Sequence, residues 1–211
     1  MKQILQPTEI EKQSFAIITK ELGNRMFPQG QDEIIKRVIH TTADFDYADN
    51  LYFSPNAIAS ARQALAQGAT IVTDTHMAMA GINKSALEKL GATVTCFMSE
   101  PEVAAQAKQR GVTRAIVSME YASRLKEPLI FVIGNAPTAL IRLHELIADR
   151  ACKPALVIGV PVGFVNVIES KELFLDGQVP CIIARGRKGG SNVAAAIINA
   201  LQYQMITREG F

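Results

Sequence analysis

Three short runs in the second half of the chain, at 129–133, 155–160 and 179–184, consist almost entirely of apolar residues, many of them β-branched. Each run is followed by polar or glycine residues and then by a stretch with helical periodicity. A strand that is apolar on both sides is buried on both faces, which is typical of a parallel sheet covered by helices. The sequence therefore predicts an α/β fold with a doubly wound, mostly parallel sheet and helices on both of its faces.

Helices are predicted in front of this sheet. A capping box at 8–11 opens a helix that ends at Gly23, and a second apolar-periodic helix covers 32–39 and ends near His40. The alternation of strands and helices starts at residue 54, where Ser54-Pro55 opens a helix. The remaining predicted elements are strands at 69–73 and 92–97, a short helix from Asn83 to Gly91, a helix capped by 99–102, and helices around 138–149, 166–175 and 192–203.

Composition is consistent with one domain over residues 1–211. The chain is 48% hydrophobic and 20% charged, which is enough to bury a full core. Its 22 Lys and Arg against 20 Asp and Glu are scattered, so a general nucleic-acid binder is not indicated. Neither a signal peptide nor an apolar run of membrane length is seen, and the three cysteines show no CxxC spacing. We expect a cytoplasmic protein with reduced thiols and no membrane partner.

The segment Gly186-Arg187-Lys188-Gly189-Gly190-Ser191-Asn192 lies between the last predicted strand and the last predicted helix. Its glycines allow close approach of the backbone, its cations attract negative charge, and a helix start presents free N–H groups. The spacing fits neither a P-loop nor a dinucleotide fingerprint, so the predicted ligand is a carboxylate or phosphate of another kind. A glycine-rich surface turn with solvated cations is the equally weighted alternative.

Polar segments follow three other predicted strands, at 73–76, 134–138 and 159–163. In a doubly wound sheet the ligand binds outside the carboxyl ends of the strands. These segments and the glycine-rich segment are therefore predicted to frame one pocket. Arg37, Arg114, Arg187 and Lys188 are each unremarkable as surface charges, but together they would suit a ligand with several carboxylates.

His40 is the best candidate for proton transfer, since it ends a helix and is followed by two threonines whose hydroxyls could orient it. A histidine stabilised by helix-end carbonyl dipoles is the alternative. His76 is a second candidate, as an imidazole oriented by the carboxylate of the neighbouring Asp74, and His144 is expected to pack or to lie on the surface. No nucleophile elbow, metal-ligand spacing or complete calcium loop is present, so we predict neither covalent catalysis nor a metal site.

Six segments of the sequence carry a further signal: EKQSF at 11–15, KRVIHTTADFD at 36–46, TDTHMAMAGI at 73–82, GNAPTAL at 134–140, GVPVGF at 159–164 with ESK at 169–171, and GRKGGSNVA at 186–194. In this order, and over nearly the whole chain, they closely resemble the precorrin-8X methylmutase family of cobalamin biosynthesis. The resemblance implies an isomerase that moves one methyl group from C-11 to C-12 of a corrin precursor, in a formal [1,5]-sigmatropic shift. It implies no redox cofactor, and a homodimer with the substrate near the subunit interface.

The resemblance also implies roles for individual residues. His40 becomes the proton donor or acceptor. The predicted substrate-binding residues are Ser14, Arg37, Thr41, Arg114, Asn135, Thr138, Arg187, Lys188, Gly189, Gly190 and Ser191. The substrate implied is a tetrapyrrole fringed with carboxylates, which agrees with the cationic pocket predicted from the residues.

The 36–46 segment looks more like the cobalt-dependent branch of the family, so the predicted substrate is cobalt-precorrin-8, with cobalt carried inside the substrate and no cofactor held by the protein. Metal-free precorrin-8X is the alternative substrate. A tetrapyrrole carrier without turnover is the alternative function, although the presence of His40, Ser14 and Arg37 together argues against it. A nucleotide-dependent oxidoreductase would lack its glycine-rich fingerprint.

Overall fold

The computed structural model describes residues 6–207 except residues 127 and 178, so both ends of the predicted 1–211 domain lie outside it. Within this part of the chain one sheet has the strand order β1-β6-β5-β4-β2-β3. The strands are β1 (Leu51–Phe53), β2 (Thr70–Thr73), β3 (Thr93–Thr95), β4 (Leu129–Ile133), β5 (Leu156–Gly159) and β6 (Cys181–Ala184). Strand β1 pairs antiparallel with β6, and every other pair is parallel. The predicted mostly parallel α/β sheet is confirmed.

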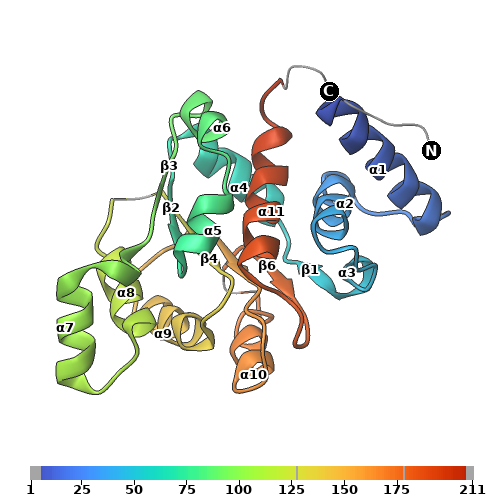
Figure 1. The fold of residues 1–211 in the computed structure, drawn as a ribbon. Coiled ribbons are helices and arrows are strands. Elements are labelled where there is room, and N and C mark those ends of the chain that lie inside the picture. The colour runs from blue at the N-terminus through green and yellow to red at the C-terminus, as the bar shows by residue number, and fades with distance from the viewer. Residues whose placement is uncertain (1–5, 127, 178, 208–211) are drawn as a thin grey trace.

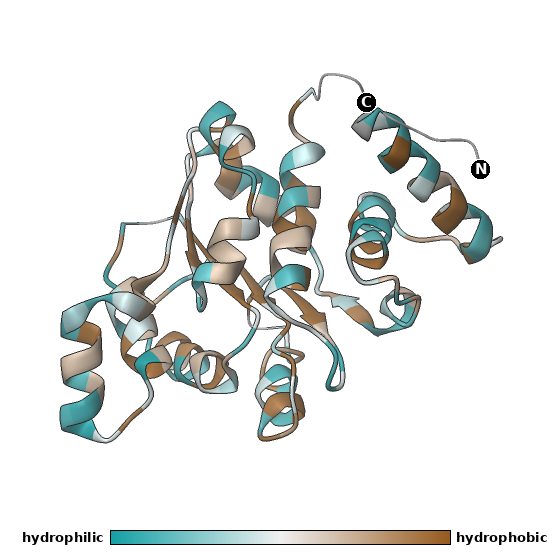
Figure 2. Ribbon diagram, in the orientation of Figure 1, coloured by the Kyte–Doolittle hydropathy of each residue, from teal (hydrophilic) through white to brown (hydrophobic). Residues whose placement is uncertain are grey.

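The apolar runs are buried on both faces, as their composition requires. In β4 every residue is buried. Ile130 and Val132 belong to one core layer, whereas Leu129, Phe131 and Ile133 belong to the other. Figure 2 shows these strands as brown arrows between helices in which brown and teal residues alternate.

Helices cover both faces of the sheet (Figure 1). One layer contains α2 (Gln31–Thr42), α4 (Ala57–Ala66), α5 (His76–Gly81), α6 (Lys84–Lys89) and α11 (Ser191–Tyr203), with α1 (Pro7–Leu22) packed on α2. The opposite layer contains α8 (Arg114–Ala122), α9 (Pro137–Ala148) and α10 (Val167–Glu172), with α7 (Pro101–Arg110) packed on α8. Two short elements, α3 (Tyr47–Asn50) and the 3-10 turn η1 (Phe97–Ser99), complete the described chain.

Three predicted helix starts are wrong. Helix α1 begins at Pro7 after Gln6, with no side-chain cap, so Thr8 lies inside the helix and forms no capping box. Proline at the first helical position supplies a preset φ and lacks an N–H that would need a cap. Helix α4 begins at Ala57 after Asn56, so Ser54-Pro55 do not open it, and the Ser54 hydroxyl accepts a hydrogen bond from the Cys181 N–H. Helix α11 begins at Ser191, one residue before the predicted 192, and the Ser191 hydroxyl contacts Thr75 instead of capping its own helix.

The sheet has its topological switch between β2 and β4. From β2 the chain passes outward to β3 over one face, and then returns across the other face to β4. Strands β5 and β6 follow on the far side of β4. The loops after β2 and β4 therefore diverge at the carboxyl edge, which is where such sheets bind ligands.

Candidate active site

The loops that follow β2, β5 and β6 contact one another at the carboxyl edge of the sheet. The Thr75 and Ser191 hydroxyls are 2.8 Å apart. The Gly190 N–H donates to the Val160 carbonyl at 2.8 Å, and the Gly163 N–H donates to the Arg187 carbonyl at 3.2 Å. The predicted meeting of the polar segments at one edge is thus observed.

Asp74 joins the loop after β4 to this group. Its buried carboxylate accepts hydrogen bonds from the backbone N–H groups of Gly134, Asn135 and Ala136, at 2.9, 2.8 and 2.6 Å. Burial raises the pKa of the Asp74 carboxyl, and the three N–H donors oppose that rise. Asp74 is therefore a structural anchor of the switch point, and it fixes the position of the exposed Asn135.

His76 does not pair with Asp74, so the hypothesis of a carboxylate-oriented imidazole at this position is wrong. Its Nε2 lies 2.7 Å from the Ser99 hydroxyl, while the Asp74 carboxylate points to the loop after β4. His144 packs edge-on against Phe174, with ring centroids 5.7 Å apart, which agrees with the packing role expected for it.

Residues 185–190, which we call the glycine loop, approach the backbone of another loop very closely. A Cβ atom at Gly189 would lie 2.0 Å from the Val160 carbonyl oxygen, and Gly190 has a φ of 134°. Both positions require glycine for this reason. The sequence suggested that the glycines admit a ligand; the structure shows that Gly189 admits the chain after β5.

The two cations of the glycine loop have different surroundings. Lys188 Nζ lies 2.6 Å from Asp44 Oδ2 and 2.7 Å from Asp46 Oδ2, which raises the pKa of Lys188 and lowers the pKa of Asp44. The exposed Arg187 places its guanidinium 5.4 Å from the centre of the Phe164 ring. Lys188 thus ties two parts of the protein together, and Arg187 is the better placed of the two to bind a carboxylate.

Lys171, on α10, lies beneath the glycine loop and was given no role by sequence reasoning. It is 1% exposed, and its Nζ donates to the carbonyl oxygens of Gly186 at 2.7 Å and Lys188 at 2.9 Å. Burial lowers the pKa of its ammonium group to about 8. One sequence signal was present: Lys171 is four residues after Val167 and so shares the inward face of a short helix.

His40 lies in the last turn of α2 with an exposed side chain. Its ring stacks at a tilt of 36° on Phe15 of α1, with centroids 5.5 Å apart. The hydroxyls of Thr41 and Thr42 donate to the carbonyls of Arg37 and Val38 on their own helix, so the expectation that they orient His40 is wrong. No hydrogen bond from the described residues engages the imidazole nitrogens, and the ring can approach a bound molecule.

Arg37 and Ser14 already have partners in the protein. The Arg37 guanidinium pairs with Glu11 at 2.5 Å and lies between the rings of Phe15 and Tyr203, at 4.8 and 5.0 Å from their centres. The Ser14 hydroxyl donates to the Ile10 carbonyl at 2.8 Å. Both residues flank Phe15 and hence His40, but a substrate carboxylate at Arg37 would have to compete with Glu11.

The His40 region and the glycine loop are connected through Lys188. Asp44 and Asp46 follow Ala43, which ends α2 in the left-handed region with a φ of 54°. The Lys188 ammonium thus fastens the glycine loop to the segment four to six residues after His40. One interaction couples the predicted acid–base residue to the predicted anion site.

Arg114 and Thr138 lie away from the His40 region. Arg114 is the exposed first residue of α8, and Thr113 before it shares a 3.0 Å hydroxyl contact with Thr138 on α9. Helices α8 and α9 lie across the sheet from α1 and α2, well apart in Figure 1. The structure therefore does not bring Arg114 together with His40 within one chain.

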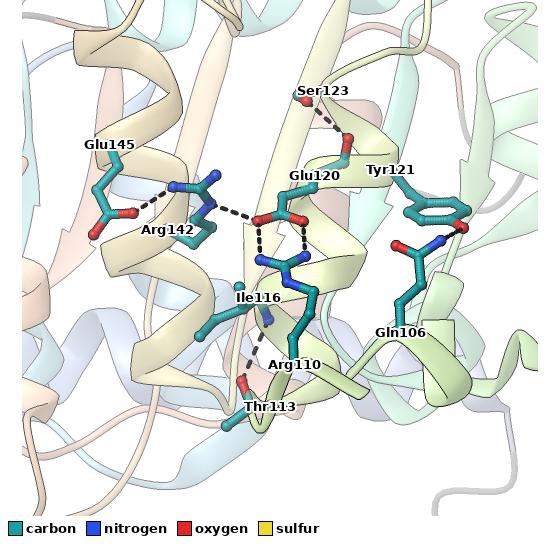
Figure 3. A network of polar contacts seen from close by, with 9 residues as sticks. All are labelled: Gln106, Arg110, Thr113, Ile116, Glu120, Tyr121, Ser123, Arg142 and Glu145. Atoms are coloured by element: carbon teal, nitrogen blue, oxygen red, sulfur yellow. Dashed lines mark hydrogen bonds and ion pairs between the residues drawn. The ribbon is translucent and has the colours of Figure 1, made fainter. Parts of the chain in front are cut away.

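A cavity of about 280 Å³ adjoins Thr138 between α8 and α9. Beside it, Glu120 pairs with Arg110 at 2.5 Å and with Arg142 at 2.9 Å, and Arg142 also pairs with Glu145 (Figure 3). These charges neutralise one another, and the volume falls just below the range of typical small-molecule sites, ~300–1,000 Å³. We assign no role in macrocycle binding to this cavity.

Within residues 6–207, gaps apart, no three His, Cys, Asp or Glu side chains are grouped so that they could hold a metal ion. In the same part of the chain, no helix combines the length and apolar character needed to cross a membrane. The three cysteines are buried.

Comparison with known proteins decides the family. A family model described as precorrin-8X methylmutase matches residues 9–204. The chain belongs to the precorrin-8X methylmutase family. It is therefore an isomerase of the methylmutase type that acts in cobalamin biosynthesis. The methylmutase fold is also seen in a crystal structure of precorrin-8X methylmutase from Thermus thermophilus, which is 39% identical, superposes with a TM-score of 0.84, and is matched over 92% of this chain and 95% of that one.

Relatives with both substrate names resemble this methylmutase to a similar degree. A cobalt-precorrin-8 methylmutase from Salmonella typhimurium is 45% identical over 97% of this chain and 99% of its own length. A protein of the same name from Priestia megaterium is 45% identical over 93% of this chain and 88% of its own. A precorrin-8X methylmutase from Pseudomonas aeruginosa is 44% identical over 91% and 93%.

Proposed function

We propose that this methylmutase converts cobalt-precorrin-8 to cobyrinate by moving a methyl group from C-11 to C-12. The bond from the methyl group to C-11 breaks as the bond to C-12 forms, and the ring double bonds shift, so the reaction consumes no oxidant or reductant. Cobalt enters within the substrate. No nucleophile is required, and catalysis then depends on holding a reactive conformation and on managing one ring proton.

The observation that carries this proposal is the position of His40. Its imidazole is exposed at the end of α2, stacked on Phe15, with no hydrogen bond from the described residues to its ring nitrogens. We propose that His40 donates a proton or a hydrogen bond to a nitrogen of the macrocycle and so favours the rearranged chromophore. Arg187, exposed on the glycine loop, is proposed to bind a peripheral carboxylate.

The test is an anaerobic ultraviolet–visible time course with cobalt-precorrin-8, run beside metal-free precorrin-8X. Conversion to the cobyrinate chromophore, faster than conversion of the metal-free compound, is the expected result. Faster turnover of precorrin-8X would move the enzyme to the metal-free branch. A bound but unchanged spectrum with both compounds would show a tetrapyrrole carrier.

His40→Ala is the matching variant. Because His40 lies on the surface of α2 and fills no core position, its loss should leave the fold intact. Turnover should fall by about 10²–10⁴-fold, the usual contribution of a positioned acid or base, while corrinoid binding persists. Substantial turnover by His40→Ala would rule out this role.

We further propose a cytoplasmic homodimer. Met77, Phe164 and Val165, on segments that follow β2 and β5, are 72%, 80% and 78% exposed. Apolar side chains of this size on neighbouring loops are typical of a surface that is covered by a ligand or a second subunit. Arg114 and His40 lie far apart in one chain, and a second copy could bring its Arg114 to the first copy's His40. Buried thiols suit a reducing compartment.

A further inference from the structure

The strongest unassigned feature of the site is the buried cation beneath the glycine loop. The Lys171 ammonium has a carbonyl oxygen of Gly186 on one side, at 2.7 Å, and that of Lys188 on the other, at 2.9 Å. These two carbonyls belong to residues on either side of Arg187. Lys171 is 1% exposed, so its loss would leave both carbonyls without this buried donor, and an unsatisfied acceptor is costly.

We propose that Lys171 is a positioning residue of the methylmutase: its ammonium group holds the glycine loop in the shape that presents Arg187 to the substrate and anchors Lys188 on the segment after His40. This inference rests on the proposed function for what the loop binds, and on geometry alone for what holds the loop. Lys171 is covered by the loop and acts through it.

The contacts form a continuous path to His40. Lys171 fixes the backbone of Lys188 from inside, and the Lys188 side chain binds Asp44 and Asp46 from outside. The loop is thus held on both sides, by α10 and by the chain after α2. Loss of the two hydrogen bonds from Lys171 would displace Arg187 and also weaken the contacts of Lys188. A displacement of 1 Å can cost on the order of 100-fold in rate.

The hold depends on the charge of Lys171, because a hydrogen bond from an ammonium group is about twice as strong as one from a neutral donor. Burial lowers the pKa of Lys171 to about 8. The charged or titratable groups on the elements packed against it are Glu169 and Glu172 on α10, Arg185, Arg187 and Lys188 on the glycine loop, and Arg142, His144 and Glu145 on α9. Substrate binding should therefore weaken as the pH rises through 8.

Stability should change in the opposite direction. Since the pKa of Lys171 is lower in the folded protein than in the unfolded chain, the unfolded chain binds the extra proton above pH 8, and stability rises with pH up to the ordinary lysine pKa. From pH 7 to 9, the melting temperature of the wild type should therefore rise relative to that of Lys171→Met. Over the same pH range, the substrate affinity of the wild type should fall.

The experiment compares wild type, Lys171→Met, Lys171→Arg and a control, Lys89→Met, whose lysine is exposed on α6. Lys171→Met should raise KM for cobalt-precorrin-8 at pH 7 by about 10-fold or more, with a smaller change in kcat, and should remove the decline in affinity between pH 7 and 9. Lys171→Arg, which stays charged, should recover part of the affinity and show no decline. Lys89→Met should match wild type.

Hydrogen–deuterium exchange without substrate gives an independent readout. Peptides covering 185–191 should exchange faster in Lys171→Met, and faster in wild type at pH 9 than the pH dependence of intrinsic exchange predicts. Unchanged exchange in Lys171→Met together with an unchanged KM would overturn the proposal. A wild-type affinity that stays flat from pH 7 to 9 would overturn its charge dependence. If wild type does not turn over either corrin precursor, the proposed function fails, and the exchange data still decide whether Lys171 holds the loop.

Discussion

Gly189 shows how one missing side chain shapes the candidate site. A Cβ atom there would lie 2.0 Å from the Val160 carbonyl oxygen and within 2.9 Å of the Pro161 carbonyl oxygen, and both neighbours are backbone. Backbone cannot rotate away as the end of a side chain can. The glycine loop and the loop after β5 therefore keep their close contact only with glycine at this position.

Gly189→Ala should accordingly destabilise the protein by about 1–3 kcal/mol, as an overpacked site does, and should raise KM because the loop moves away from the sheet edge. The measurement is urea unfolding together with steady-state kinetics. Gly177→Ala separates the two possible causes: Gly177 has a φ of 80° but nothing within 4 Å of its Cβ position, so it reports backbone strain alone, whereas Gly189 has no positive φ and reports the close contact alone. A Gly189→Ala variant with wild-type stability and KM would contradict the steric explanation.

At the scale of elements, Lys188 connects the glycine loop to the end of α2. If its contacts with Asp44 and Asp46 position the His40 segment, then removing Lys188 should have the full effect and removing Asp44, which leaves the Asp46 contact, a part of it. Lys188→Met and Asp44→Asn should each lower kcat/KM, and the double variant should be no worse than Lys188→Met, because the interaction can be lost only once. Additive losses would mean that Lys188 and Asp44 act independently, and would contradict this coupling. Salt should weaken the interaction of Lys188 with the two aspartates in the wild type, since Lys188 is exposed.

Elements with a strong local signal were predictable from the sequence, and elements defined by distant partners were not. The apolar runs predicted β4, β5 and β6, and apolar periodicity predicted α2. Strand β6 begins at Cys181 instead of 179, because Pro180 has no N–H to donate to the ladder. Strand β1 has three residues and exists because it pairs with β6, so no local pattern could reveal it.

The candidate site, too, could be predicted from the sequence only in part. The position of His40 at a helix end and the glycine content of the 186–192 segment could be read from the sequence. The partners of the cations could not, because Lys188 meets Asp44 across 144 positions and Lys171 meets Gly186 across 15. Both lysines look like solvated charges in the sequence, yet in the folded protein both hold a loop. Charge alone therefore indicates an anion site without showing which cations face it.

At the scale of the whole molecule, the layers of the fold separate predicted substrate contacts that should act together. His40 ends a helix in one layer and Arg114 begins a helix in the other, well apart in Figure 1. A macrocycle near His40 could then contact an Arg114 only if that arginine comes from a second copy. In a symmetric dimer, each of two equivalent sites would combine the His40 of one copy with the Arg114 of the other.

Complementation tests this arrangement. His40→Ala and Arg114→Ala homodimers should both be impaired, the first in kcat and the second in KM. When the two variants are co-expressed, a mixed dimer has one site with both defects and one intact site, and random pairing should restore about a quarter of wild-type activity. Co-expression of His40→Ala with a His40→Ala/Arg114→Ala double variant is the control and should restore none. If the first pair also recovers nothing although differently tagged copies of the two variants co-purify as mixed dimers, then both residues act in the same chain, and a macrocycle bound there must reach across the carboxyl edge of a single subunit.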